Sequence, residues 1–214
     1  MTERTTVDFY FGLGSRYSYL ASTQIDWIEA QYGCRFVWKP ISSGALMALR
    51  GSNPFKSEPV SGQYDWGYRE YDAKGWAAYY SVTFREPRPL AVDPARVAHA
   101  ALAAETEGAM IPCCRAIFAM TYVEHAVIDE AALLSLPARL GLDPEGFEMR
   151  MDAPEIRARH DAIVAEAHRR GAFGVPTFFL GDHMFWGNDR LVLLEAALRG
   201  VEMPSLNPLN GLEK

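Results

Sequence analysis

The sequence predicts an α/β protein in which a long helical insertion interrupts one small mixed β-sheet. Three observations predict this class. Residues 6–41 show a β-α-β pattern, residues 177–198 show a β-β-α pattern, and mainly helical patterns lie between them. We therefore expect a split domain, formed by residues 1–45 and 170–214, around an all-helical domain of residues 46–169.

The first strand, helix and second strand follow from residue type. Thr6–Phe11 is rich in β-branched and aromatic residues and is followed by glycines, which is typical of a strand before a turn. Ser15 is a favoured N-cap and Gly33 a favoured C-cap, so a single helix is expected between them. Arg35–Ile41 predicts a second strand that ends near Pro40. The β-α-β order predicts that the two strands are parallel, with a right-handed crossover.

The middle of the chain is predicted to be mainly helical. Residues 42–50 suit a short helix, residues 51–63 a loop, and residues 64–80 a longer helix. Asp93 suits an N-cap and Pro94 the first helical position, and several further helices are expected after them.

Aromatic residues are concentrated in the helix predicted over residues 64–80. Most of them are expected in the core, and the remainder could line an apolar pocket for an aromatic substrate. They are Trp66, Tyr68, Tyr71, Trp76, Tyr79 and Tyr80.

The C-terminal part returns to strands. Thr177–Leu180 and His183–Trp186 flank a Gly-Asp turn, which predicts a short antiparallel hairpin. Asn188 or Asp189 is expected to cap a last helix over Arg190–Leu198.

The composition excludes several classes of protein. Among 214 residues, Lys and Arg total 21 and Asp and Glu total 27, so the net charge is −6. An acidic chain is a poor nucleic-acid binder, because phosphates require a basic face. No stretch approaches the ~20 apolar residues of a membrane span. The N-terminus does not have the pattern of a signal peptide, so we expect a cytoplasmic protein.

The cysteines and histidines suggest neither disulfides nor a metal site. Cys34, Cys113 and Cys114 form no C-x-x-C pattern and are expected to be buried, reduced thiols. The five histidines form no H-x-x-H spacing, so no metal is expected.

Three segments could carry chemistry. Ser15, at the start of a helix, could donate a hydrogen bond to an anion or thiolate, although its local sequence favours a capping role. The bond between Val175 and Pro176, directly before a strand, could be cis or trans. Asn188 and Asp189 could hold the charged end of an amino-acid ligand, or could form a cap and a surface ion pair.

Together these segments resemble a known family. DFYFGLGSRYSYLA and AFGVPTFFLGDHMFWGNDRL are similar to segments of 2-hydroxychromene-2-carboxylate isomerases. The resemblance implies a thioredoxin-like fold with a helical insertion, related to kappa-class glutathione transferases and bacterial disulfide oxidoreductases. It also implies a homodimer and a glutathione-dependent cis–trans isomerisation. The substrate would be 2-hydroxychromene-2-carboxylate and the product trans-o-hydroxybenzylidenepyruvate, as in naphthalene degradation.

The resemblance assigns a role to each matching residue. Ser15 takes the place of the catalytic serine. The predicted glutathione-binding residues are Val175, Pro176, Trp186, Asn188 and Asp189. Asn53 and Tyr17 are assigned to the substrate. Arg16 stands where the family usually has proline, and Gly12-Leu13-Gly14 replaces a stretch that usually contains Asp. These departures bear on the substrate rather than on the fold.

Other functions stay open at this point. A kappa-like glutathione transferase or peroxidase would use the same cofactor on another electrophile, and a non-catalytic protein could bind glutathione alone. A disulfide oxidoreductase is disfavoured, because Ser15-x-x-Ser18 replaces the two cysteines that it needs. The substrate carboxylate needs a basic partner, for which Arg16, Lys56 and Arg85 are candidates.

Overall fold

The sheet of this computed structural model has four strands within the described residues, 4–51 and 66–204. They are β1 (Thr6–Phe11), β2 (Arg35–Pro40), β3 (Thr177–Leu180) and β4 (His183–Trp186). Their order is β2-β1-β3-β4. The β1–β2 pair is parallel, and the other two pairs are antiparallel. The predicted mixed sheet is therefore confirmed.

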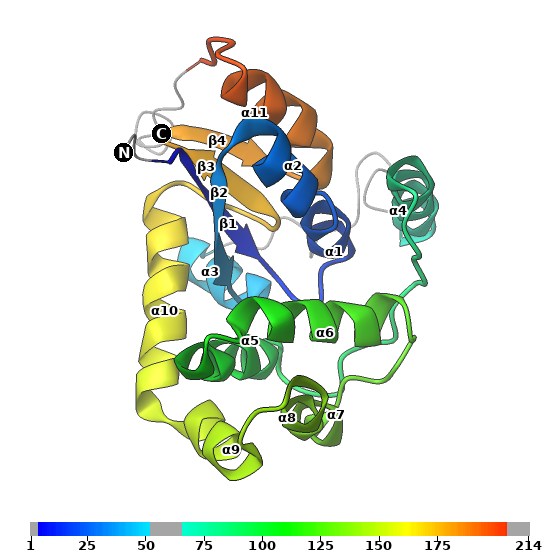
Figure 1. The fold of residues 1–214 in the computed structure, drawn as a ribbon, viewed down its shortest axis with the longest axis vertical. Coiled ribbons are helices and arrows are strands. Elements are labelled where there is room, and N and C mark those ends of the chain that lie inside the picture. Colours follow the sequence, from blue (N-terminus) through cyan, green and yellow to red (C-terminus); the bar gives the residue numbers. More distant parts are fainter. Residues whose placement is uncertain (1–3, 52–65, 205–214) are drawn as a thin grey trace.

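One face of the sheet forms the main core. Strand residues alternate between the two faces, and Val7, Phe9 and Phe11 point to this one. Three helices complete the same core: α1 (Arg16–Ser22), α2 (Ile25–Tyr32) and α11 (Leu191–Leu198). In Figure 1 these helices lie together beside the sheet.

The other face of the sheet is covered by α3 (Ser43–Arg50) and α10 (Pro154–Arg169). Tyr10 of β1 packs here with Leu46 of α3 and Val164 of α10. In Figure 1, α10 runs along the sheet on the side away from α1 and α11. These two helices precede and follow the remaining helices of the insertion, so the sheet fixes both ends of that segment.

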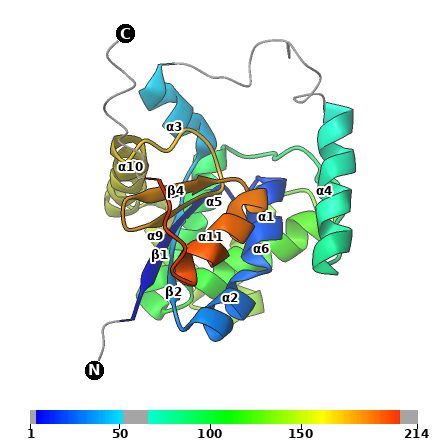
Figure 2. The same cartoon turned by 90° about the horizontal axis from the view of Figure 1, so that it is seen from above.

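The remaining helices lie between α3 and α10 in the chain. They are α4 (Trp66–Tyr80), α5 (Pro94–Ala103), the 3₁₀ helix η1 (Ala104–Glu107), α6 (Met110–Tyr122), α7 (Glu130–Leu134), α8 (Leu136–Leu140) and α9 (Pro144–Asp152). Phe118 of α6 lies 5.9 Å from both Phe11 and Tyr19, between ring centroids, so α6 shares the core of the sheet. Figure 2 shows α3 and α4 on either side of α1. None of the helices in the described part of the chain is long and apolar enough to cross a membrane.

The single helix predicted between Ser15 and Gly33 is wrong, because the helix breaks after Ser22. The Ser22 hydroxyl donates to the Tyr19 carbonyl at 2.6 Å, and the Thr23 hydroxyl donates to the Leu20 carbonyl at 2.7 Å. Such side-chain bonds compete with the helical backbone pattern. The chain therefore turns at Thr23 and begins again as α2.

The predicted cap of the last helix is also wrong. Asn188–Arg190 form a 3₁₀ turn, η2, and neither Asn188 nor Asp189 caps α11. Gly187 precedes this turn with φ 103°, a conformation that favours glycine. The turn leaves Asn188 and Asp189 at the end of the hairpin rather than at the start of α11.

The prediction that most aromatic residues of α4 lie in the core is wrong. Tyr68, Tyr71 and Tyr79 are exposed, and Trp76 and Tyr80 are half-buried against the core. The side chain of Trp66 lies outside the part that the structure describes. The most deeply buried positions of this helix are instead Ala73 and Ala77. Helix α4 therefore packs closely along a narrow stripe of small residues.

Replacing His160 with alanine is expected to destabilise the fold and loosen α3. His160 is buried in α10, and its Nε2 accepts a hydrogen bond from the Ser42 backbone N–H at 3.1 Å. Leaving that buried donor unpaired costs about 1–3 kcal/mol. Urea denaturation measures the loss. His160→Gln should restore part of it, whereas His168→Ala, a half-buried position of the same helix, should cost less. Equal losses at both histidines would contradict the role given to His160.

Candidate active site

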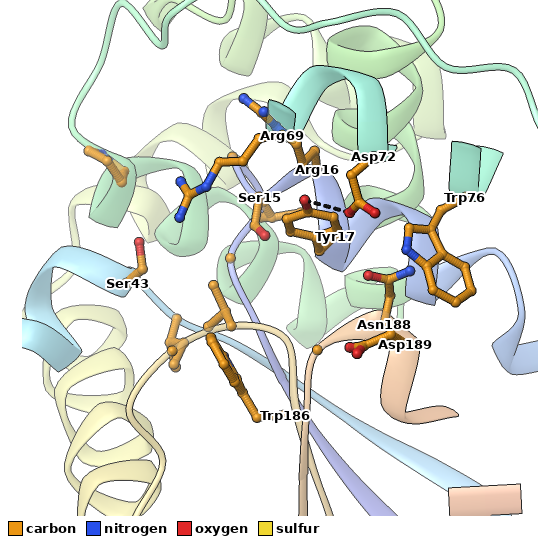
Figure 3. Close-up of a pocket in the computed structure, with 18 of the residues that line it drawn as sticks. Ser15, Arg16, Tyr17, Ser43, Arg69, Asp72, Trp76, Trp186, Asn188 and Asp189 are labelled. Carbon is orange, nitrogen blue, oxygen red and sulfur yellow. Dashed lines mark hydrogen bonds between the residues drawn. The ribbon is translucent and has the colours of Figure 1, made fainter. Parts of the chain in front are cut away.

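A cavity of about 610 Å³ lies where the insertion meets the end of the sheet. Its walls come from the β1–α1 loop, the start of α3, α4, the residues before β3, and the turn after β4 (Figure 3). The predicted site residues that line it are Ser15, Tyr17, Val175, Trp186, Asn188 and Asp189. Pro176 directly follows Val175, whereas Asn53 lies outside the described residues. Residues from both ends of the chain thus meet in one cavity.

Ser15 caps α1 and also faces the cavity. Its Oγ accepts a hydrogen bond from the Ser18 backbone N–H at 3.3 Å, which confirms the capping role. Ser18, where a second cysteine would stand in a C-x-x-C motif, is fully buried and accepts from the Gly12 backbone N–H. A hydroxyl that accepts one hydrogen bond still has its own proton to donate. Ser15 can therefore cap the helix and donate to a ligand simultaneously.

The segment before β3 lies close to the loop that carries Ser15. The Val175–Pro176 peptide bond is cis. A Cβ atom on Gly12 would lie 3.3 Å from Val175 Cγ2, so the Val175 side chain packs closely against the Gly12 backbone. A Cβ atom on Gly174 would lie only 2.6 Å from the Trp186 ring nitrogen. Glycines at these two positions therefore allow β1, β3 and the Trp186 ring to meet at the cavity.

Asn188 contributes a buried side-chain amide whose N–H donors face the question of a ligand partner, because the described protein residues supply none. Its side chain is buried, and its Nδ2 has no hydrogen-bond partner among the described residues. Its backbone carbonyl accepts from the Tyr80 hydroxyl at 3.2 Å, which fixes the turn. An unpaired buried amide is costly, so an acceptor atom on a ligand would stabilise this end of the cavity. The neighbouring Asp189 pairs with Arg190 at 2.8 Å, as the ion-pair alternative predicted.

Tyr17 connects α1 to α4. Its hydroxyl donates to Asp72 Oδ2 at 2.8 Å (dashed line in Figure 3). Burial is the main cause that raises the pKa of Tyr17 above its ordinary value, and the hydrogen bond to Asp72 raises it further. The phenol therefore stays neutral at physiological pH, so its proton remains available for the hydrogen bond to Asp72 that joins α1 to α4.

Trp76 and Tyr68 line the cavity, as expected for some of the aromatic residues of α4, whereas Arg69 and Asp72 were given no role from the sequence. Arg69, Asp72 and Trp76 lie on α4 and line the cavity. Their spacing of three and four residues puts them on one helix face, but spacing alone does not show that this face meets α1 and the cavity. Of the three basic candidates, Arg16 lines the cavity and pairs with Glu86 at 2.5 Å, Arg85 does not line it, and Lys56 lies outside the described residues.

The cavity wall contains no cysteine among the described residues. Cys34, Cys113 and Cys114 are buried and form no disulfide, as predicted. Burial raises the pKa of the Cys113 thiol to about 12, and that of Cys114 well above its ordinary value. No cluster of His, Cys, Asp and Glu within residues 4–51 and 66–204 could hold a metal ion. A thiol that reacts here would have to come from a ligand.

The mixed sheet, the cis-proline beside it and the helical insertion define a thioredoxin-like protein of the DsbA type. A family model described as "DSBA-like thioredoxin domain" matches residues 6–199, so the chain belongs to that family. Within it, the chain belongs to the 2-hydroxychromene-2-carboxylate isomerase family. It is 31% identical to the Pseudomonas putida enzyme of that name, over 90% of this chain and 93% of the relative. It is 30% identical to the enzyme of the same name from Pseudomonas sp. (strain C18), over 96% of this chain and 92% of the relative.

Solved structures agree with this family. A structure of 2-hydroxychromene-2-carboxylate isomerase is 28% identical and has a TM-score of 0.78, covering 91% of this chain and 95% of its own. The cytosolic disulfide reductase DsbM from Pseudomonas aeruginosa, solved with GSH, has a TM-score of 0.60 at 21% identity, over 91% and 99% of the two chains. At that identity the likeness to DsbM concerns the fold alone. The thioredoxin-like fold predicted from the sequence is confirmed.

Proposed function

We propose that this protein is a glutathione-dependent isomerase that interconverts 2-hydroxychromene-2-carboxylate and trans-o-hydroxybenzylidenepyruvate. The curated relatives carry the name of this activity. The observation that carries the proposal is the position of Ser15, which faces a cavity with no cysteine in its described wall. Disulfide exchange would need a thiol there. Homodimeric assembly, a cytoplasmic location and the division into a split domain and an insertion stay predictions.

The residues of the cavity suit glutathione. This tripeptide carries a central thiol, two carboxylates and an ammonium group, and peptide N–H and C=O groups. The Val175 backbone, at the cavity wall, can pair with the peptide groups. The unpaired Asn188 amide can donate to a carboxylate, and the Asp189 carboxylate can receive the ammonium group. A cavity of about 610 Å³ is in the usual range for ligand sites. DsbM, which shares the fold, binds GSH in its solved structure.

Ser15 is proposed to favour the ionised form of the bound thiol. Glutathione supplies a thiolate that can add to the conjugated double bond of the substrate, allow rotation, and leave again. A free thiol has a pKa near ~8.5, so only a small part is ionised at neutral pH. A hydrogen bond from the Ser15 hydroxyl favours the thiolate over the thiol and lowers that pKa. Each unit of lowering corresponds to about 1.4 kcal/mol.

The rest of the cavity is proposed to hold the aromatic substrate. Met47 and Leu90 provide apolar surface on the walls of the cavity. They can pack against the substrate ring and exclude water from the reacting bond. Tyr17 keeps α4 against α1 through its bond to Asp72, and its ring also lines the cavity. These residues orient the substrate, while Ser15 acts on the sulfur.

Glutathione dependence is the direct test of this function. We expect the protein to isomerise 2-hydroxychromene-2-carboxylate with reduced glutathione, without consuming it. The control is γ-glutamyl-2-aminobutyryl-glycine, in which a methyl group replaces the thiol; it should bind but not support turnover. Equal rates with the two tripeptides would contradict the mechanism. Stoichiometric consumption of glutathione, with this acid or with aryl halides and peroxides, would instead indicate a transferase or peroxidase.

A further inference from the structure

Among the described residues, three arginines line the cavity. Arg16 is directed to the carboxylate of Glu86, 2.5 Å away, and its side chain is only 11% exposed. Arg190 belongs to the turn after β4, where it pairs with Asp189. Arg69 comes from α4 and lies near Arg16 in Figure 3.

Arg69 lies on the cavity-facing side of α4. It precedes Asp72 by three residues and Trp76 by seven, and all three line the cavity. The hydrogen bond between Tyr17 and Asp72 fixes this face of α4 next to the start of α1. The position of Arg69 relative to Ser15 is thus set by a bond only one helical turn away.

The close-up separates two sides of the cavity around Ser15. In Figure 3, Arg69 and Ser43 lie on one side of Ser15. Asn188 and Asp189, which are assigned to glutathione, lie on the other side. Because the sulfur is proposed to lie at Ser15, the side with Arg69 is available to the electrophile that the sulfur attacks.

We propose that Arg69 binds the carboxylate of the substrate and makes the site specific for aromatic acids. This proposal rests on the proposed function. A guanidinium group offers two parallel N–H donors that match a carboxylate, which a lysine cannot reproduce. The chain has a net charge of −6, so an anionic substrate gains from a local positive group. The Ser43 hydroxyl, on the same side, provides a second donor.

The test compares binding of an acid and its ester without turnover. Calorimetry measures binding of trans-o-hydroxybenzylidenepyruvate and its methyl ester to protein saturated with γ-glutamyl-2-aminobutyryl-glycine. We expect the wild type to bind the acid at least about tenfold more tightly than the ester. Arg69→Gln should remove this preference and leave ester binding within about twofold, because the ester makes no ionic contact. The acid preference of Arg69→Lys should fall between that of the wild type and that of Arg69→Gln.

Lys74→Gln is the matched control, since Lys74 is an exposed cation of the same helix that pairs with Glu70 and does not line the cavity. It removes the same charge and should leave the preference intact. The titrations are repeated without the tripeptide, so the result does not depend on glutathione binding. A wild type without acid preference, or an Arg69→Gln variant that keeps it, would overturn the proposal. If Arg69→Gln weakened only the binding of the tripeptide, Arg69 would belong to the glutathione site, and this result would also overturn the proposal. Acid preference without isomerisation would contradict only the proposed function.

Discussion

Replacing Ser15 with alanine is expected to raise the pKa of bound glutathione by about one to two units. A hydrogen bond to a charged group contributes about 1.5–3 kcal/mol, and one pKa unit corresponds to about 1.4 kcal/mol. Since the lost donor favours only the thiolate, the variant should have less thiolate at neutral pH. Its turnover should then fall about tenfold to a hundredfold and recover as the pH rises. Glutathione affinity should stay within a few-fold.

Ser42→Ala is the matched control for this experiment. Ser42 also caps a helix, with its Oγ accepting from the Ala45 N–H at 3.4 Å, and it does not line the cavity. Each substitution should cost about 0.5–2 kcal/mol of stability through the lost cap. Only Ser15→Ala should move the thiolate absorbance titration. Burial raises the pKa of Cys113 and Cys114, so their ionisation does not overlap with that of glutathione. Identical titration curves for wild type and Ser15→Ala would rule out the role of Ser15.

Asp189→Ala is expected to weaken glutathione binding about tenfold to a hundredfold, because it removes a charge-assisted hydrogen bond. The expected partner is the ammonium group of the γ-glutamyl residue. Calorimetry with glutathione measures the loss. Cysteinylglycine, which lacks that residue, should bind wild type and variant equally. Asp182→Ala, which removes an exposed carboxylate from the β3–β4 turn, should have no effect.

Two observations would contradict this role of Asp189. One is an unchanged dissociation constant for glutathione. The other is an equal loss with cysteinylglycine, which would indicate that the variant disturbs the turn as a whole. Arg190→Ala distinguishes loss of the Asp189 carboxylate from disturbance of the turn, because Arg190 is the ion-pair partner of Asp189. It removes that pair and leaves the carboxylate in place.

The strands could be predicted because each carries its own signal. β1 and β3 are rich in aromatic and β-branched residues and are bounded by Gly or Pro, so local sequence alone determines their limits. The break after Ser22 was missed because it arises from hydroxyl bonds that compete with a good helical pattern. The turn at Asn188 was missed because it depends on the positive φ of Gly187. Both errors come from local geometry that residue preference does not capture.

In the candidate site, too, some residues could be predicted from the sequence and others could not. Ser15, Val175 and Asn188 stand at strand ends, where a pattern can locate them, and all three line the cavity. Arg69 and Asp72 belong to the insertion, and no local pattern tells which face of α4 meets α1. Tyr17 and Asp72 are 55 residues apart in the chain, so their contact depends on tertiary packing. Such a contact cannot be predicted from helical spacing alone.

The single hydrogen bond between Tyr17 and Asp72 joins two parts of the chain with different proposed tasks. Sulfur chemistry is assigned to the sheet side, through Ser15 and the segment at Val175, whereas recognition of the electrophile is assigned to α4. The scaffold is in this sense modular. A library that varies the cavity-facing positions of α4 while keeping Tyr17 and Asp72 should therefore alter which electrophiles are accepted without changing thiol acidity. Enzyme engineering could use this division to redirect the protein toward new aromatic compounds.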